Sequence, residues 1–172
     1  LPASAIIGSG LQYGWYYVML DTGNHGGTSV TVESSNPSLA LVAPDQYTAG
    51  SASIVLPVAD GVTSTRFYIQ GMEGVTGSTS ITASAPAFTG DNMAVNIVQP
   101  ALRLTGLLTN TTVLSADDSF QVNIGIPNGD NSSIAVNQYR GSGAARQASA
   151  QWSPIARPQW ANWSPLRSPA RV

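Results

Sequence analysis

Between Thr28 and Val98 the sequence contains five short segments in which apolar and polar residues alternate: SVTVE (29–33), SIVLPV (53–58), TRFYI (65–69), SITA (80–83) and MAVNIV (93–98). Alternation with a period of two is typical of strands that bury one face. Turn-forming residues separate the segments, as in SNPS (35–38), ADG (59–61) and GVTG (74–77). Short strands punctuated about every ten residues predict a β-sandwich or a β-barrel.

The alternation assigns one row of side chains from each segment to a common core. The residues expected to point inward are Val30, Val32, Ile54, Leu56, Val58, Phe67, Ile69, Ile81, Ala83, Met93, Val95 and Ile97. Two further strands, at Gln12–Leu20 and Leu39–Val42, bring the expected total to about seven. Each fully buried large aliphatic side chain contributes ~1.5–3 kcal/mol, so these rows suffice for the core of one domain.

The pattern divides the 172 residues into four parts: a lead-in (1–10), an antiparallel β-sandwich (11–98), a partial second β unit (99–139) and an irregular tail rich in arginine, proline and tryptophan (140–172). The second unit contains strand-like sequence around Leu104 and Val122. Two or three strands cannot close a sandwich, so this unit is expected to be incomplete and to expose an edge.

Composition narrows the class of protein. Hydrophobic residues make up 42% of the chain and charged residues 9%, far below the ~25% usual for soluble domains. The chain has no cysteine, which excludes disulfides, thiol nucleophiles and thiolate metal sites. No apolar run approaches the ~20 residues that a transmembrane helix needs. Because the chain begins at Leu1, we treat it as a fragment whose export signal, if any, lies upstream.

One family resemblance follows from the order of three segments. The sequence VTVESSNPSLALV (30–42) resembles a strand-turn-strand of bacterial immunoglobulin-like repeats, and IVLPVADG (54–61) and GSTSITASAP (77–86) are similar to later segments of that family. The similarity covers roughly residues 22–126. It implies an immunoglobulin-like sandwich of seven strands, arranged in tandem on surface or secreted proteins, and it implies no catalytic residues.

The function expected from these features is a structural or adhesive repeat module of a bacterial extracellular or cell-surface protein. Such a module is a spacer or tether, and its partners are neighbouring repeat domains, with a surface glycan or protein as a further candidate. No paired carboxylates, nucleophile elbow or phosphate loop is discernible, so we expect no enzyme activity, no cofactor and no metal.

A carbohydrate-binding module is the alternative. The aromatic residues that could stack on sugar rings are Trp15, Tyr16, Tyr17 and Tyr68, with Tyr47 as a further candidate. Consecutive residues of a strand point to opposite faces, however, which argues against a common platform for the first three.

Other polar residues have ordinary explanations. His25 is the only histidine and lies in a glycine-rich turn, so a loop role is favoured over metal binding or base catalysis. Asp117, Asp118, Asp130 and Asn131 could supply calcium ligands, but their spacing lacks the EF-hand pattern. Asn110 and Asn131 begin N-glycosylation triplets, which also occur by chance.

The charge of the tail differs from that of the remainder. Residues 1–139 hold nine acidic residues and two arginines, whereas residues 140–172 hold five arginines and no acid. Trp152, Trp160 and Trp163 lie among these arginines, a pattern found in binders of single-stranded nucleic acid and of anionic membranes. Two alternatives are favoured over nucleic-acid and membrane binding: a tail that folds back over the exposed edge of the second unit, and an altered reading frame.

Overall fold

The computed structural model describes residues 1–108, 110, 112 and 119–141, and the regular structure within them is entirely β. The strands are β1 (Ser4–Gly8), β2 (Gln12–Met19), β3 (Thr28–Ser34), β4 (Ala40–Ala43), β5 (Ser53–Val58), β6 (Ser64–Gly71), β7 (Gly77–Ser84), β8 (Asp91–Val98), β9 (Ala101–Thr105), β10 (Gln121–Pro127) and β11 (Ile134–Asn137). No helix in this part of the chain is long and apolar enough to cross a membrane. The expected tail lies outside the described residues from position 142 onward.

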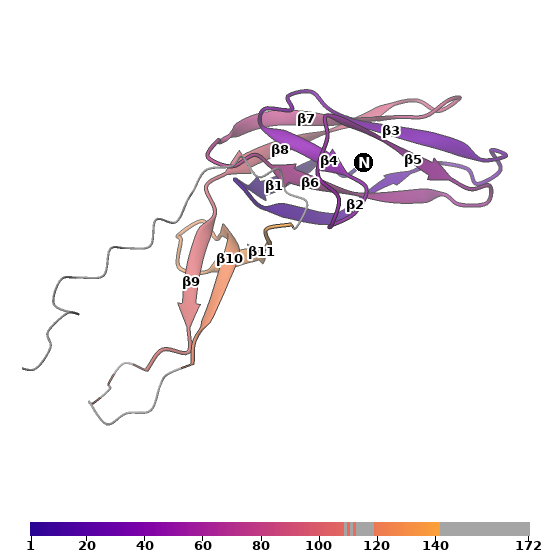
Figure 1. The fold of residues 1–172 in the computed structure, drawn as a ribbon. Coiled ribbons are helices and arrows are strands. Elements are labelled where there is room, and N and C mark those ends of the chain that lie inside the picture. Colours follow the sequence, from indigo (N-terminus) through magenta and orange to yellow (C-terminus); the bar gives the residue numbers. More distant parts are fainter. Residues whose placement is uncertain (109, 111, 113–118, 142–172) are drawn as a thin grey trace, which may run out of the picture.

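Three sheets result from these strands (Figure 1). A large sheet has the order β1-β8-β7-β3-β5, a small sheet has the order β2-β6-β4, and an end sheet has the order β11-β10-β9. The series β3-β7-β8 and β2-β6-β4 correspond to the C-F-G and B-E-D series of an immunoglobulin domain. The expected all-β, immunoglobulin-like sandwich is therefore confirmed.

The core lies between the large and small sheets. Val30, Val32, Ile81 and Val95 of the large sheet are fully buried, as is Phe67 of the small sheet. Of the twelve side chains expected to point inward, eleven are buried, and the twelfth, Ile54, is partly buried and packs against the core. The period-two alternation therefore assigned the inner faces correctly.

Residues 1–10 are not a lead-in, which corrects the expectation from the sequence. Strand β1 pairs in parallel with β8, from Ser4 opposite Ala94 to Gly8 opposite Val98. Its inward residues Ala5 and Ile7 are buried. Strand β1 has only two inward residues before a glycine-rich turn. Its alternation is therefore too short to be recognised as a strand from the sequence. The sandwich thus has eight strands rather than seven, and one pair is parallel.

The end sheet projects from one end of the sandwich (Figure 1). It contains three strands where the sequence suggested about two, the additional one being β11. Gln138, directly after β11, is buried: its Oε1 accepts a hydrogen bond from Gly8 N (2.8 Å) and its Nε2 donates one to Ile6 O (2.8 Å). Arg140 also forms an exposed ion pair with Glu73 at 2.6 Å. The end sheet is therefore hydrogen-bonded to β1 through Gln138, and it is also connected to β8 along the chain.

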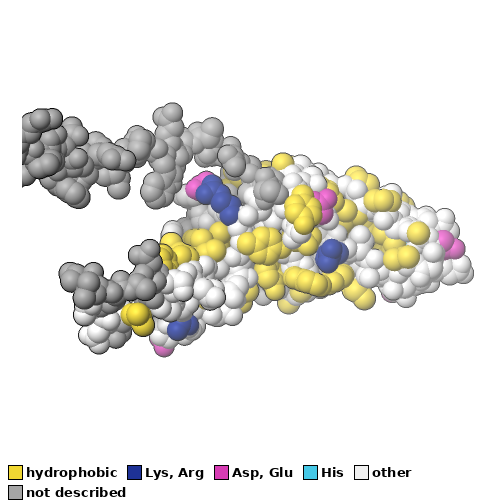
Figure 2. All heavy atoms as spheres, turned by 60° about the horizontal axis from the view of Figure 1, so that its bottom comes forward, with side chains coloured by type: hydrophobic (Ala, Val, Ile, Leu, Met, Phe, Trp, Pro, Cys, Tyr) yellow, Lys and Arg dark blue, Asp and Glu magenta, His cyan; other side chains and the backbone are white. Residues whose placement is uncertain are grey.

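The outer surface carries few charged groups. On the face shown in Figure 2, hydrophobic patches lie among neutral polar surface, with only scattered charged side chains. This agrees with the charged fraction of 9%.

Replacing Phe67 by alanine is expected to lower the free energy of unfolding by about 3–5 kcal/mol, because the ring is fully buried between the sheets. The control is Val55→Ala, since Val55 alternates with the core residues of β5 and is 63% exposed. Urea denaturation followed by tryptophan fluorescence measures both. Equal losses for the two variants would contradict the assignment of inner and outer faces.

A fragment of residues 1–98 is expected to be more stable than a fragment of residues 11–98. The shorter fragment lacks β1, so it loses the burial of Ala5 and Ile7 and leaves the edge of β8 unpaired. Thermal unfolding by circular dichroism measures the difference. Indistinguishable melting temperatures would show that β1 contributes nothing to the sandwich.

Candidate functional site

The outer face of the small sheet is shaped by a β-bulge in β2. Tyr13 lies opposite Ile69 and Tyr16 lies opposite Phe67, so Gly14 and Trp15 together oppose the single residue Tyr68. Trp15 adopts a positive φ of 73°, an unusual conformation for a residue with a side chain. The bulge leaves its indole 63% exposed.

An arginine lies between two aromatic rings on this face. The guanidinium carbon of Arg66 is 5.3 Å from the ring centroid of Trp15 and 5.6 Å from that of Tyr68. Both distances are within the range of cation–π attraction. Tyr17 is the cross-strand partner of Arg66, so its side chain extends the same face.

Tyr68 points away from the core but is nevertheless buried, with 6% of its surface exposed. Gly14 explains part of this burial, because a Cβ atom at that position would collide with the Tyr68 ring. Tyr139, which follows β11, approaches from the end sheet: its carbonyl accepts a hydrogen bond from Gln12 N at 2.8 Å. Burial is the main cause that raises the pKa of the Tyr139 hydroxyl, and the neighbouring Tyr68 raises it further.

We call this set of residues the aromatic–arginine patch: Trp15, Tyr17, Arg66, Tyr68 and Tyr139. Trp15 is well exposed, and Tyr17 and Tyr139 are exposed to 38% and 40%. The patch presents flat aromatic rings beside the Arg66 guanidinium, which can donate several hydrogen bonds. Such a surface can stack on a planar or cyclic ligand and bind its hydroxyl or anionic groups.

The predicted aromatic residues divide between two faces. Trp15, Tyr17 and Tyr68 lie together in the patch, whereas Tyr16 points toward the core. The Tyr16 ring packs edge-on against Tyr13, with ring centroids 5.8 Å apart, and in a tilted arrangement against Phe67, with centroids 5.9 Å apart. Burial raises the pKa of the Tyr16 hydroxyl strongly.

Tyr47 is 72% exposed in the loop after β4, where its backbone N–H donates to Asp45. Sequence reasoning missed Arg66 and Tyr139. A signal for Arg66 was present, since it lies two positions before Tyr68 and therefore shares its face.

A network of buried amides supports the patch from one side. Gln12 is fully buried: its Nε2 donates to Gln46 O at 2.9 Å, and its Oε1 accepts from Gln70 Nε2 at 3.1 Å. Gln70 also donates to Thr48 O and accepts from Gly50 N, both at 2.9 Å. The loop between β4 and β5 is therefore tied to the same strands that carry the aromatic rings.

His25 has a structural environment in its loop. Its Nε2 lies 3.0 Å from Val62 O, and its Nδ1 accepts a hydrogen bond from Gly27 N at 3.2 Å. Its ring also packs edge-on against Phe88. Asp60 holds the same loop by accepting from the backbone N–H groups of His25 and Gly26. The two contacts leave neither ring nitrogen directed at a ligand.

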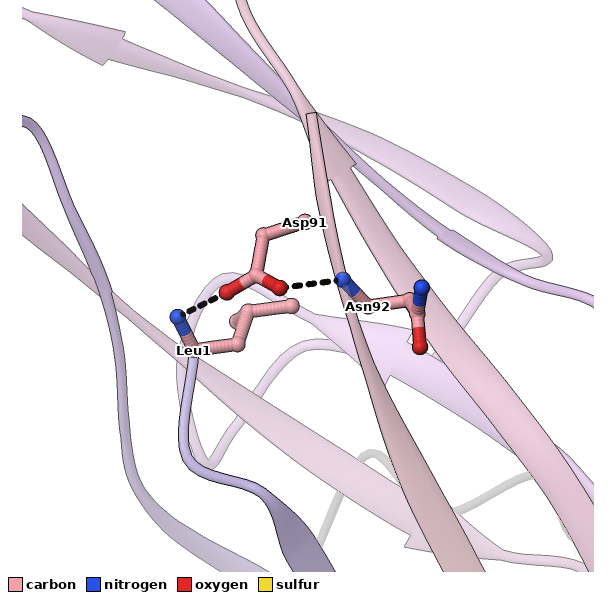
Figure 3. Close-up of polar contacts among 3 residues, drawn as sticks. All are labelled: Leu1, Asp91 and Asn92. Atoms are coloured by element: carbon pink, nitrogen blue, oxygen red, sulfur yellow. Dashed lines mark hydrogen bonds and ion pairs between the residues drawn. The ribbon is translucent and has the colours of Figure 1, made fainter. Parts of the chain in front are cut away.

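Two hollows lie at the opposite end of the sandwich from the end sheet. One, of about 480 Å³, is lined by residues that include Asp21, His25 and Phe88. The other, of about 250 Å³, lies beside Leu1 and Asp91. Figure 3 shows the Asp91 carboxylate accepting from the Leu1 ammonium at 2.7 Å and from Asn92 N at 2.8 Å. The hydrogen bond from the Leu1 ammonium has the largest effect in lowering the pKa of the Asp91 carboxyl, and the hydrogen bond from Asn92 N lowers it further.

No group of three or more His, Cys, Asp or Glu residues suited to a metal ion occurs among the residues described by the structure. Asp130 caps a turn by accepting from Ser132 N at 2.9 Å, and hydrogen bonds from Ser132 lower its pKa. Asn131 lies in the same turn with a φ of 57°. Asp117 and Asp118, the other candidate calcium ligands, lie outside the described residues.

Comparison with known proteins adds little to this description. No family model and no curated protein matches the chain. One solved structure with some similarity is that of SSP-19, an MSP-domain protein like family member in Caenorhabditis elegans. The match has 12% identity and a TM-score of 0.38, and it covers 56% of this chain and 94% of SSP-19. Similarity at this level carries no argument about function.

Replacing Gly14 by alanine is expected to lower the free energy of unfolding by about 1–3 kcal/mol, because the new methyl group would overlap the Tyr68 ring. The control is Gly129→Ala, where nothing lies within 4 Å of the added Cβ. Urea denaturation measures both variants. If both were equally stable, the close packing of the bulge against Tyr68 would be wrong.

Proposed function

We propose that this chain is a structural and adhesive module of an extracellular or cell-surface protein, which acts as a spacer or tether between neighbouring domains and has no enzymatic activity. The resemblance of residues 22–126 to bacterial immunoglobulin-like repeats supports a bacterial surface protein as its source.

One observation carries the proposal: the parallel pairing of β1 with β8. The chain enters the sandwich at the Ser4 end of β1 and leaves it at the Val98 end of β8. Because the strands are parallel, tension applied at these two points pulls them in opposite directions along their length. The hydrogen bonds between them are then loaded together rather than one after another. This geometry suits a module that transmits force.

The junction with the end sheet also suits a tether. A linker of only two residues, Gln99 and Pro100, connects β8 to β9. The buried Gln138 binds the backbone of β1 on both sides of Ile7. Hydrogen bonds to buried backbone groups are costly to break, so this contact restricts bending between the sandwich and the end sheet.

Single-molecule pulling tests the proposal, and the absence of cysteine allows attachment points to be chosen freely. In one variant, the pulling force is applied through cysteines at Leu1→Cys and Gln99→Cys, which serve as attachment points (handles). Force between these points shears β1 against β8. Handles on Asn24→Cys and Ala59→Cys lie beside the end of the β3–β5 pair formed by Thr28 and Val58, and they open it one hydrogen bond at a time.

We expect a clearly higher unfolding force for the first pair of handles than for the second at the same loading rate. Handles at 1 and 99 that gave an equal or lower force would remove the mechanical basis of the proposal. Melting temperatures of the two labelled proteins provide the control for stability.

The aromatic–arginine patch favours glycan binding as a second candidate function. Affinity gel electrophoresis with soluble polysaccharides tests it. If the patch binds sugar, Trp15→Ala abolishes the retardation, whereas Tyr47→Ala, which removes an exposed ring outside the patch, leaves it unchanged. No retardation of the parent chain by any polysaccharide would exclude this candidate.

A further inference from the structure

The strands of the small sheet are neutral apart from one arginine. Strands β2, β4 and β6 contain no acidic residue, and Arg66 is their single basic residue. Residues 1–139 as a whole hold nine acidic residues and two arginines. The outer face of this sheet is therefore a local positive region on an acidic part of the chain.

The Arg66 guanidinium has no carboxylate partner among the residues that the structure describes. By contrast, Arg140 forms an ion pair with Glu73 at 2.6 Å. Arg66 is exposed and lies within cation–π distance of the Trp15 and Tyr68 rings, at 5.3 and 5.6 Å. The rings restrict the guanidinium without neutralising its charge, so it can bind an anion at a small cost in conformational entropy.

The exposure of Trp15 is imposed by the backbone. A tryptophan at a positive φ of 73° is conformationally strained, and the bulge holds its ring in solvent rather than in the core. Tyr17 and Met19 follow at alternate positions of the same edge strand and are also exposed. Strain and exposed apolar surface both cost stability, and here they are concentrated beside Arg66. Such a combination is typical of a ligand-binding site.

We propose that the aromatic–arginine patch binds an acidic polysaccharide, in which a sugar ring stacks on Trp15 and the carboxylate of a uronic acid unit binds the Arg66 guanidinium. This inference rests on glycan binding, the second candidate function, and adds the class of glycan. A planar guanidinium can bind a carboxylate through two parallel hydrogen bonds. The flat apolar face of a sugar ring can pack on an exposed indole.

The number of charges disfavours single-stranded nucleic acid as the ligand. Nucleic acid carries a phosphate at every nucleotide, and proteins that bind single strands combine stacking rings with a positively charged groove. The small sheet offers one guanidinium, and the acidic excess of residues 1–139 repels a densely charged polymer. One cation beside flat rings fits a polymer whose carboxylates are separated by neutral sugars, as in hyaluronan.

Affinity gel electrophoresis of the full chain with acidic polysaccharides tests the proposal. The probes are hyaluronan, polygalacturonate and alginate, each compared with its carboxyl-reduced form, which keeps the sugar rings and loses the charge. We expect at least one acidic form to retard the parent chain. The dissociation constant for the reduced form of the same polymer should be higher, on the order of tenfold, because a charge-assisted hydrogen bond is lost.

Arginine variants separate a specific contact from a change in net charge. Arg66→Gln should raise the dissociation constant for the acidic form about tenfold and leave that for the reduced form unchanged. Arg103→Gln is the matched control, because it removes the same charge at an exposed position of β9, and it should bind like the parent chain. Arg66→Lys keeps the charge without the planar fork and should have intermediate affinity. Thermal unfolding by circular dichroism checks that each variant is folded, and Arg66→Lys carries the comparison if Arg66→Gln is not.

The outcomes separate this inference from the candidate function on which it rests. Equal retardation by the acidic and the carboxyl-reduced forms leaves glycan binding intact and overturns the acidic ligand. So does an Arg66→Gln variant that binds the acidic forms like the parent chain, or an equal loss of affinity in Arg103→Gln. Absence of retardation by every polysaccharide, acidic or neutral, removes glycan binding itself and this inference with it. Tighter binding of poly(dT) than of any uronic acid polymer would assign the patch to nucleic acid and would also overturn the proposal.

Discussion

The fold depends on the burial of one alternating row of side chains from each strand between the large and small sheets. Val30, Ile81 and Val95 meet Phe67 and Ile69 across this interface, and all are fully buried. The register of the strands in the sandwich depends on this burial. A shift by one residue in any strand would turn its apolar row to solvent, so the pairing of strands is fixed by the core rather than by the loops.

The same dependence explains what the sequence could reveal and what it could not. Period two was unambiguous in β3, β5, β6, β7 and β8, and the inner faces could be predicted residue by residue. Strand β1 was missed because Ala5 and Ile7 alone do not establish a period. Its partner β8 is 90 residues away at Ala94, and nothing local indicates such a pairing.

The candidate site was accessible to prediction only in part. The rule that consecutive residues alternate faces separates Tyr16 from Trp15 and Tyr17 correctly. The bulge at Gly14 and Trp15, however, puts Tyr13 and Tyr16 on the same face although they are three positions apart. A bulge costs one unpaired residue and leaves no composition signal beyond the glycine. The role of Tyr139 depends on the path of the chain after β11, which brings it beside Gln12 only in three dimensions.

Neutral side-chain amides, rather than ion pairs, make the buried polar contacts where the sheets and the loop between β4 and β5 meet. Gln12, Gln70 and Gln138 are all buried, and each both donates and accepts a hydrogen bond. Gln12 and Gln70 bind each other and the loop between β4 and β5, whereas Gln138 binds two backbone groups of β1. An amide can donate and accept at once, so one side chain satisfies a backbone N–H and a backbone C=O without the desolvation cost of a buried charge. A chain with 9% charged residues can therefore join its sheets and loops through specific contacts.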